Sequence, residues 1–203
     1  MKNNKEMIEV FKENVDIHRL LKDEEGLNIP NDRSDFISYI EFLKYFNDLR
    51  KITRHNVIIG INFTYGWMPT IFNFRSNEID IVIYILKKAK QGIIPDEAQL
   101  DTLKRCFNNS LVGTSKILHF INPKIFAIWD SRVFRYLTER EPHQNIINNY
   151  KSYLDYLEFC KYMTEKPEYH KIHESIIKKV GYEMTKFRTL ELVMYMKGGK
   201  NVR

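Results

Sequence analysis

The residues best suited to chemistry lie between Ser110 and Leu137, in the segment SLVGTSKILHFINPKIFAIWDSRVFRYL. Asp130 follows five apolar residues and opens a predicted helix whose first turns carry Arg132 and Arg135. Capping a helix N-terminus explains an aspartate fully at such a position, and it stabilises a helix by about 0.5–2 kcal/mol. The cap does not explain the neighbourhood, in which a glycine, a following lysine and an apolar return precede the aspartate and arginines follow it. These features have to be weighed together.

A second candidate is the sequence Leu-Val-Gly-Thr-Ser, which precedes a predicted helix over 114–121. Gly113 predicts a tight turn, because glycine adopts backbone conformations that other residues avoid. Backbone N–H groups at a helix start, here those of Gly113, Thr114 and Ser115, can bind a phosphate near the positive end of the helix dipole. Lys116 follows them and adds a positive charge. A glycine that only permits the turn is the alternative.

Taken together, the two elements resemble the HhH-GPD (helix-hairpin-helix) superfamily of base-excision DNA glycosylases, of the 8-oxoguanine glycosylase and endonuclease III kinds. The usual family text is a hairpin such as LPGVGxKTA, followed by a strand-like approach to VDTHVxR. The hairpin would be residues 110–117, and the aspartate element would be residues 128–135. By motif the resemblance covers about 28 residues, and the surrounding series of helices is similar to the family's layout.

The resemblance implies removal of a damaged or modified base from double-stranded DNA, after the base has been flipped out of the duplex. Asp130 would stabilise the sugar cation and orient the nucleophile as the N-glycosidic bond breaks. Lys116 would be the amine nucleophile of those members that also cleave the strand. The residues that would bind DNA are Gly113, Thr114, Ser115, Arg132 and Arg135. The residues that would stack on the extruded base are Trp67 and Tyr65. No cofactor is expected.

Several positions depart from the family pattern. Leu111 stands where the first glycine is expected, and Arg132 stands where histidine is common. If the hairpin is aligned on Gly113, Ser115 rather than Lys116 takes the position of the family's lysine. One residue corresponds to about 100° around a helix, so the two side chains point in different directions. Monofunctional members need only the aspartate, so the departures make Asp130 a stronger candidate than Lys116, and the choice between the two mechanisms stays open.

Other reactive side chains have weaker patterns. His170 and His173 have the spacing of two metal ligands on one helix face, but no third ligand is evident, and we expect no metal site. We expect His119 to be a partly buried structural histidine, and Cys106 and Cys160 to be packing residues. The sequence contains no phosphate-binding loop of nucleotide hydrolases, no dinucleotide-binding motif and no zinc-protease motif.

The charge of the chain is concentrated near its C-terminal end. The net charge is +6, and the residues from Lys166 onward carry nine basic and four acidic side chains, or +5. Such a segment could neutralise DNA phosphates. The alternative is a solvated lysine-rich helix surface, which charge alone favours.

The elements that position these residues are predicted to be helices, so we expect an all-α fold, a compact multi-helix domain. Only 8 glycines and 6 prolines occur in 203 residues, whereas 13 phenylalanines and 12 tyrosines suit aromatic packing between helices. The predicted helices cover residues 3–22, 34–50, 76–90, 95–107, 114–121, 130–137, 145–165, 168–179 and 184–196. The β-branched stretch over 55–72 could be a strand or a helix, and a helix is favoured. We expect an N-terminal helix within 1–30 and the helical domain over 31–203.

Two cysteines and the lack of an apolar run of about 18 residues favour an intracellular, cytoplasmic protein that does not enter a membrane. The oligomeric state is not predicted. Two other functional classes stay open. One is a non-catalytic helical module that binds nucleic acid or a protein, and the other is a helical toxin or phage-defence component with unrelated chemistry.

Overall fold

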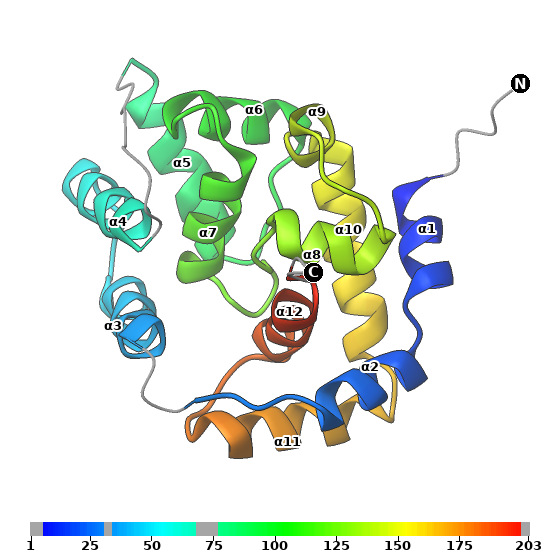
Figure 1. The fold of residues 1–203 in the computed structure, drawn as a ribbon. Coiled ribbons are helices and arrows are strands. Elements are labelled where there is room, and N and C mark those ends of the chain that lie inside the picture. The colour runs from blue at the N-terminus through cyan, green and yellow to red at the C-terminus, as the bar shows by residue number, and fades with distance from the viewer. Residues whose placement is uncertain (1–5, 31–33, 68–76, 200–203) are drawn as a thin grey trace, which may run out of the picture. The chain divides into compact units, whose positions relative to one another are not determined.

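The computed structural model describes residues 6–30, 34–67 and 77–199, and over these residues the fold is all-α, as predicted (Figure 1). The helices are α1 (Met7–Asn14), α2 (Ile17–Glu25), α3 (Ser34–Asp48), α4 (Arg54–Gly66), α5 (Ile79–Lys90), α6 (Glu97–Cys106), α7 (Leu111–Ile121), α8 (Ser131–Thr138), α9 (Gln144–Ile147), α10 (Tyr150–Thr164), α11 (Tyr169–Val180) and α12 (Lys186–Lys197). The described residues contain no β-strand. The ambiguous β-branched stretch is therefore helical up to Gly66, and its continuation through 68–72 lies outside the described residues, as does the predicted helix start at Ser76.

The helices form two compact units. The first unit combines residues 1–31 with residues 127–203, and the second comprises residues 32–126. The expected division was into 1–30 and 31–203, whereas here the C-terminal helices group with the N-terminal ones. The grouping has a physical reason, because α1 and α2 bury their apolar faces against α8, α10, α11 and α12.

Two helices that the hydrophobic pattern predicts as continuous are each divided by a capping residue. In place of one helix over 3–22, the chain extends at Val15, and Asp16 caps α2 by accepting a hydrogen bond from the backbone N–H of Arg19 at 2.7 Å. In place of one helix over 145–165, Asn149 caps α10 by accepting from the N–H of Ser152 at 2.9 Å. Short polar side chains of this kind favour caps over helix interiors.

In the first unit, α12 is the central helix. Every residue from Phe187 to Met194 is buried, because α2, α8, α10 and α11 all pack against this helix. The buried stretch includes an ion pair between Arg188 and Glu191, which lie one turn apart. The ring of Trp129 packs beside the rings of Phe11, Phe134 and Tyr156, in the part of the core that leads to α8.

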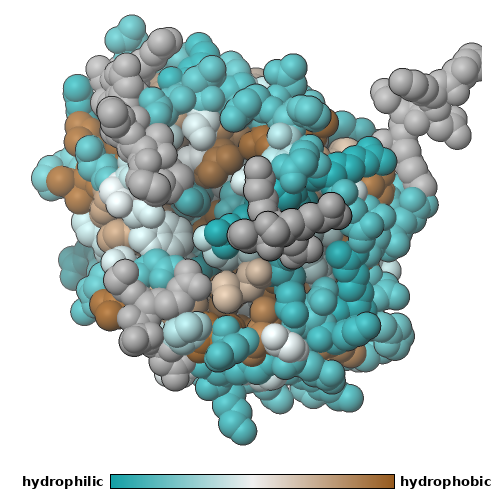
Figure 2. Space-filling view, viewed as in Figure 1, coloured by the Kyte–Doolittle hydropathy of each residue, from teal (hydrophilic) through white to brown (hydrophobic). Residues whose placement is uncertain are grey.

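In the second unit, α7 is the central helix, and α3, α4, α5 and α6 pack around it. Aromatic rings fill the space between α3, α4 and α7. Phe42 stacks on Phe63 with their ring centroids 4.3 Å apart, and Phe120 meets the edge of Phe42 at 5.4 Å. Phe63 is half-buried and contributes its ring to this aromatic cluster. In the view of Figure 2, hydrophilic side chains cover much of the described surface, and hydrophobic ones are interspersed among them. Among the described helices, none has the length and apolar character that a membrane span requires.

Candidate functional site

Asp130 uses only one of its carboxylate oxygens to cap α8. Oδ1 accepts hydrogen bonds from the backbone N–H groups of Arg132 at 2.9 Å and Val133 at 3.0 Å. Oδ2 accepts no hydrogen bond from any of the described residues, and the side chain is half-buried. The carboxylate is therefore oriented by the helix and still has an oxygen that can act on a ligand.

The segment before Asp130, residues 126–129, belongs to no helix or strand, and side chains donate to two of its carbonyl groups. The hydroxyl of Tyr153 lies 3.4 Å from the carbonyl oxygen of Ala127, and the hydroxyl of Tyr156 donates to the carbonyl of Ile128 at 3.1 Å. The indole N–H of Trp129 donates to the carbonyl of Ile147 at 3.0 Å. α10 thus holds the segment that presents Asp130.

The two arginines behind Asp130 differ in their surroundings. Arg132 is exposed, and its guanidinium carbon lies 4.6 Å from the ring centroid of Tyr195. Arg135 is paired with Glu141 at 3.2 Å and donates to the carbonyl of Gly198 at 3.3 Å. Arg132 is consequently available to a phosphate, whereas Arg135 already has two partners within the first unit.

The expected tight turn at Gly113 is wrong. Gly113 lies in the first turn of α7 with a negative φ, and the chain reverses earlier, at Asn108 and Asn109, whose φ angles are 60° and 53°. Asparagine tolerates this left-handed region better than most residues. Ser110 caps the helix: its hydroxyl accepts from the N–H of Gly113 at 3.1 Å, and its carbonyl accepts from the N–H of Thr114 at 3.0 Å.

These contacts contradict the predicted phosphate site. The N–H groups of Gly113 and Thr114 are occupied by Ser110, and the residues from Gly113 to Ser115 are all buried. The side-chain hydroxyl of Thr114 donates to the carbonyl of Ser110 at 2.9 Å, and that of Ser115 donates to the carbonyl of Val112 at 2.8 Å. Helix capping and core packing use the groups that were expected to bind DNA.

Tyr65, expected to stack on a base, belongs to the core instead. It is 3% exposed, and its hydroxyl donates to the carbonyl of Phe107 at 2.7 Å. Burial raises the pKa of this hydroxyl to about 12. The ring packs directly on Gly113, where a Cβ atom would overlap the Tyr65 hydroxyl oxygen and lie 2.8 Å from Cζ. Close approach of α4 to α7, not a turn, therefore explains the glycine at this position.

Lys116 and Trp67 lie together in the second unit. The Lys116 ammonium is 5.2 Å from the centroid of the half-buried Trp67 ring, which is the geometry of a cation–π contact. The indole N–H of Trp67 donates to the carbonyl of Asp35 at 3.2 Å, which fixes the ring. Ser115, at the position of the family's lysine, is buried.

His119 is a structural histidine, as expected, and is fully buried. Nδ1 lies 2.6 Å from the carbonyl oxygen of Phe126, and Nε2 lies 2.8 Å from the hydroxyl of Tyr39. A carbonyl can only accept, so Nδ1 carries a proton and donates to Phe126. Cys106 and Cys160 are also buried, and burial raises the pKa of both thiols, which suits packing rather than nucleophilic chemistry.

The two candidate metal ligands on α11 have other partners. His170 Nδ1 lies 2.9 Å from the carbonyl oxygen of Pro167, and His173 Nδ1 lies 3.0 Å from the hydroxyl oxygen of Thr189. Across the described parts of the chain, no group of three or more His, Cys, Asp and Glu side chains could hold a metal ion.

The candidate residues fall into two sets. Asp130, Arg132 and Arg135 belong to the first unit, and Tyr65, Trp67 and the residues from Gly113 to Lys116 belong to the second. Sequence reasoning missed Tyr156 as a supporting residue, because its spacing on α10 is that of any core position. The chain matches no family model, no curated protein and no solved structure.

Proposed function

We propose that the protein is a DNA glycosylase related to the HhH-GPD superfamily, in which Asp130 promotes hydrolysis of the N-glycosidic bond of a damaged or modified base. The observation that carries this proposal is that the two oxygens of the Asp130 carboxylate have different surroundings. Oδ1 accepts the hydrogen bonds that cap α8, whereas Oδ2 has no hydrogen-bond donor among the described residues. The hydroxyls of Tyr153 and Tyr156 on α10 hold the segment that presents this carboxylate.

The reaction assigns a defined task to that second oxygen. When the bond between the base nitrogen and C1′ breaks, its electron pair leaves with the base, and positive charge develops on the sugar. The carboxylate stabilises this charge, orients a water molecule toward C1′ and accepts the proton that the water loses. Arg132, which is exposed near the same helix start, is suited to bind a backbone phosphate.

A hydrolytic mechanism is favoured over strand cleavage by a lysine. The residue at the family's lysine position, Ser115, is buried and donates to the Val112 carbonyl. Lys116 is one position further along the helix and lies over Trp67. Lyase activity would require Lys116 to leave that ring and attack C1′.

The test is base release from duplexes that each carry one lesion, an oxidised guanine, a uracil or an alkylated purine, under single-turnover conditions. Asp130→Asn preserves capping, because asparagine caps as well as aspartate, yet it removes the negative charge. We expect it to lower the rate of release about a hundredfold or more and to leave DNA affinity unchanged. The matched control is Asp96→Asn, which changes the cap of α6 in the same way and should release base at the wild-type rate.

Equal rates for Asp130→Asn and wild type would reject Asp130 as the catalytic residue. Salt-sensitive DNA binding without release of any base would instead support the non-catalytic binding module. Borohydride trapping separates the two mechanisms: a hydrolytic enzyme gives no trapped complex, whereas a complex that disappears in Lys116→Met would establish an amine nucleophile.

A further inference from the structure

The segment 127–129 has an unusual hydrogen-bonding requirement. Its three residues are buried, yet they belong to no helix or strand, so no neighbouring backbone ladder satisfies their carbonyl groups. A buried carbonyl without a donor is costly, and native structures avoid it. For the carbonyl groups of Ala127 and Ile128, the donors are side chains of α10.

Two tyrosines one turn apart on α10 reach consecutive carbonyls. Tyr156 makes the better bond, with 3.1 Å between its hydroxyl and the oxygen of Ile128, against 3.4 Å between Tyr153 and Ala127. The ring of Tyr156 also packs on the indole of Trp129, with centroids 5.0 Å apart. Tyr156 therefore contacts both residues that directly precede Asp130.

We propose that Tyr156 is a positioning residue for Asp130, which it orients by holding the Ile128 carbonyl and the Trp129 ring. The inference rests on the proposed function of Asp130. With Ile128 and Trp129 held, the backbone enters α8 in a single direction, and the Oδ1 cap then sets where Oδ2 points. Catalytic geometry is sensitive to such placement, since an error of about 1 Å can cost about a hundredfold in rate.

The hydroxyl of Tyr156, and not its ring alone, positions Asp130. A phenylalanine would fill nearly the same volume, but it would leave the Ile128 carbonyl without this donor. Burial raises the pKa of the Tyr156 hydroxyl well above its ordinary value, and nearby Cys160 and Glu191 raise it further. The hydroxyl consequently stays protonated, and remains a donor, at neutral pH.

The test compares Tyr156→Phe with a matched control, Tyr169→Phe. Tyr169 is also fully buried in the first unit, and its hydroxyl donates to the backbone carbonyl of Lys186 at 2.9 Å. Each variant thus deletes one buried hydroxyl that donates to a backbone carbonyl, and the Tyr169 hydroxyl also lies 2.8 Å from that of Thr189, so the control removes at least as many hydrogen bonds as the test variant. Three quantities are measured for each: the single-turnover rate of base release, the affinity for the lesion duplex, and hydrogen exchange at the amides of Arg132 and Val133.

We expect Tyr156→Phe to slow base release about tenfold or more relative to Tyr169→Phe, with affinities of the two variants within about twofold. The amides of Arg132 and Val133, which the Asp130 cap protects, should exchange faster in Tyr156→Phe only. Equal release rates in the two variants would overturn the positioning role. If the wild type released no base, the proposed function would fail first, and equal exchange in both variants would then overturn the positioning role independently.

Discussion

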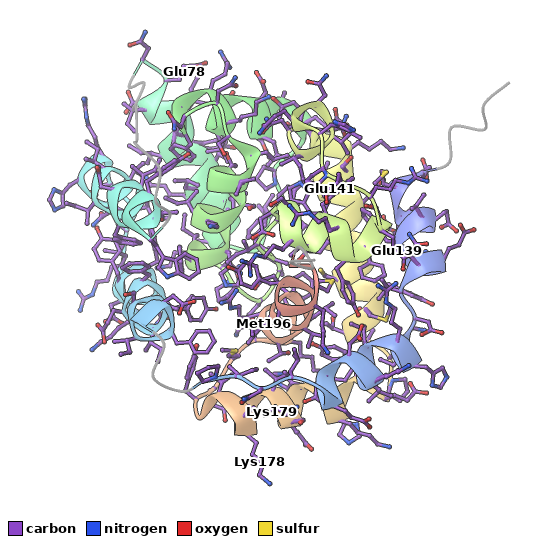
Figure 3. The ribbon with its side chains drawn as sticks, viewed as in Figure 1. Glu78, Glu139, Glu141, Lys178, Lys179 and Met196 are labelled. Carbon is purple, nitrogen blue, oxygen red and sulfur yellow. The ribbon has the colours of Figure 1, made fainter. Side chains whose placement is uncertain are left out.

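Lys179 holds Glu24 by two contacts, one to the carboxylate at 2.5 Å and one to the backbone carbonyl at 2.6 Å. Ser175 donates to the same carboxylate at 2.7 Å, and Glu24 is only 5% exposed. These bonds connect α11 to α2 within the first unit. One lysine of the basic C-terminal segment is therefore a structural residue, whereas its neighbour Lys178 is exposed and projects away from α11 (Figure 3).

Replacing Lys179 should destabilise the protein, and replacing Lys178 should not. Lys179→Met leaves the buried Glu24 carboxylate with only its serine donor, which should lower the free energy of unfolding by about 1–3 kcal/mol. Lys178→Met changes a surface residue and should stay within about 0.5 kcal/mol of wild type. Urea unfolding of both variants measures the difference. Equal stabilities would show that the contacts to Glu24 contribute nothing net.

DNA binding should depend on the exposed lysines of the C-terminal segment. Neutralising Lys178 and Lys186, which are both exposed, should weaken binding and reduce the slope of log affinity against log salt by about 1 for each phosphate that the variant no longer neutralises. The control is a variant in which Lys51 and Lys124, both exposed in the second unit, are neutralised instead. This variant changes the net charge by the same amount. If both double variants weaken binding to the same extent, net charge rather than the C-terminal surface governs binding.

Gly113 should not tolerate alanine. The added methyl group would overlap the Tyr65 hydroxyl, and overpacking of this kind costs about 1–3 kcal/mol. Gly66→Ala is the matched control in the same unit, because nothing lies within 4 Å of a Cβ at Gly66. Thermal unfolding of the two variants tests the contact, and a Gly113→Ala protein as stable as Gly66→Ala would contradict the close approach of α4 to α7.

Stability should decrease at mildly acidic pH because of His173. Burial lowers the pKa of His173, Lys186 lowers it further, and Glu183 and Glu174 oppose the shift. The folded state then holds this proton more weakly than the unfolded chain, whose histidine pKa is about 6.5. The contribution of His173 is complete above that pH and is lost as the pH falls below it. His173→Gln should flatten the dependence of unfolding free energy on pH between about 7 and 5, and Lys171→Gln, exposed on the same helix, should not.

Most helices could be predicted from the sequence, because a 3.6-residue hydrophobic period is a local property. The pattern predicts α3, α6 and α11 to within a few residues of where they lie. It fails at Asp16 and Asn149, where a short side chain caps a new helix although the apolar period continues. Capping depends on which backbone N–H the side chain reaches, and the period carries no information on that choice.

Some features of the candidate site could likewise be predicted from the sequence, and others could not. That Asp130 begins a helix could be predicted from its residue type and its apolar approach, and the structure places it there. The turn predicted at Gly113 is wrong because a glycine permits either a turn or a close contact, and only the neighbour Tyr65 distinguishes them. Likewise, no feature of the local sequence distinguishes Lys179, which is paired with Glu24, from Lys178, which is exposed.

Local sequence is sufficient to predict the all-α class, the place of most helices and the start of α8 at Asp130. Composition, hydrophobic period and capping act over a few neighbouring residues, so no long-range contact is needed to predict them. Packing of the folded chain selects which carbonyls Tyr153 and Tyr156 reach, which oxygen of Asp130 stays available, and which lysines are exposed. Those outcomes depend on contacts between residues far apart in the chain, because burial and hydrogen-bond partners are properties of the packed molecule.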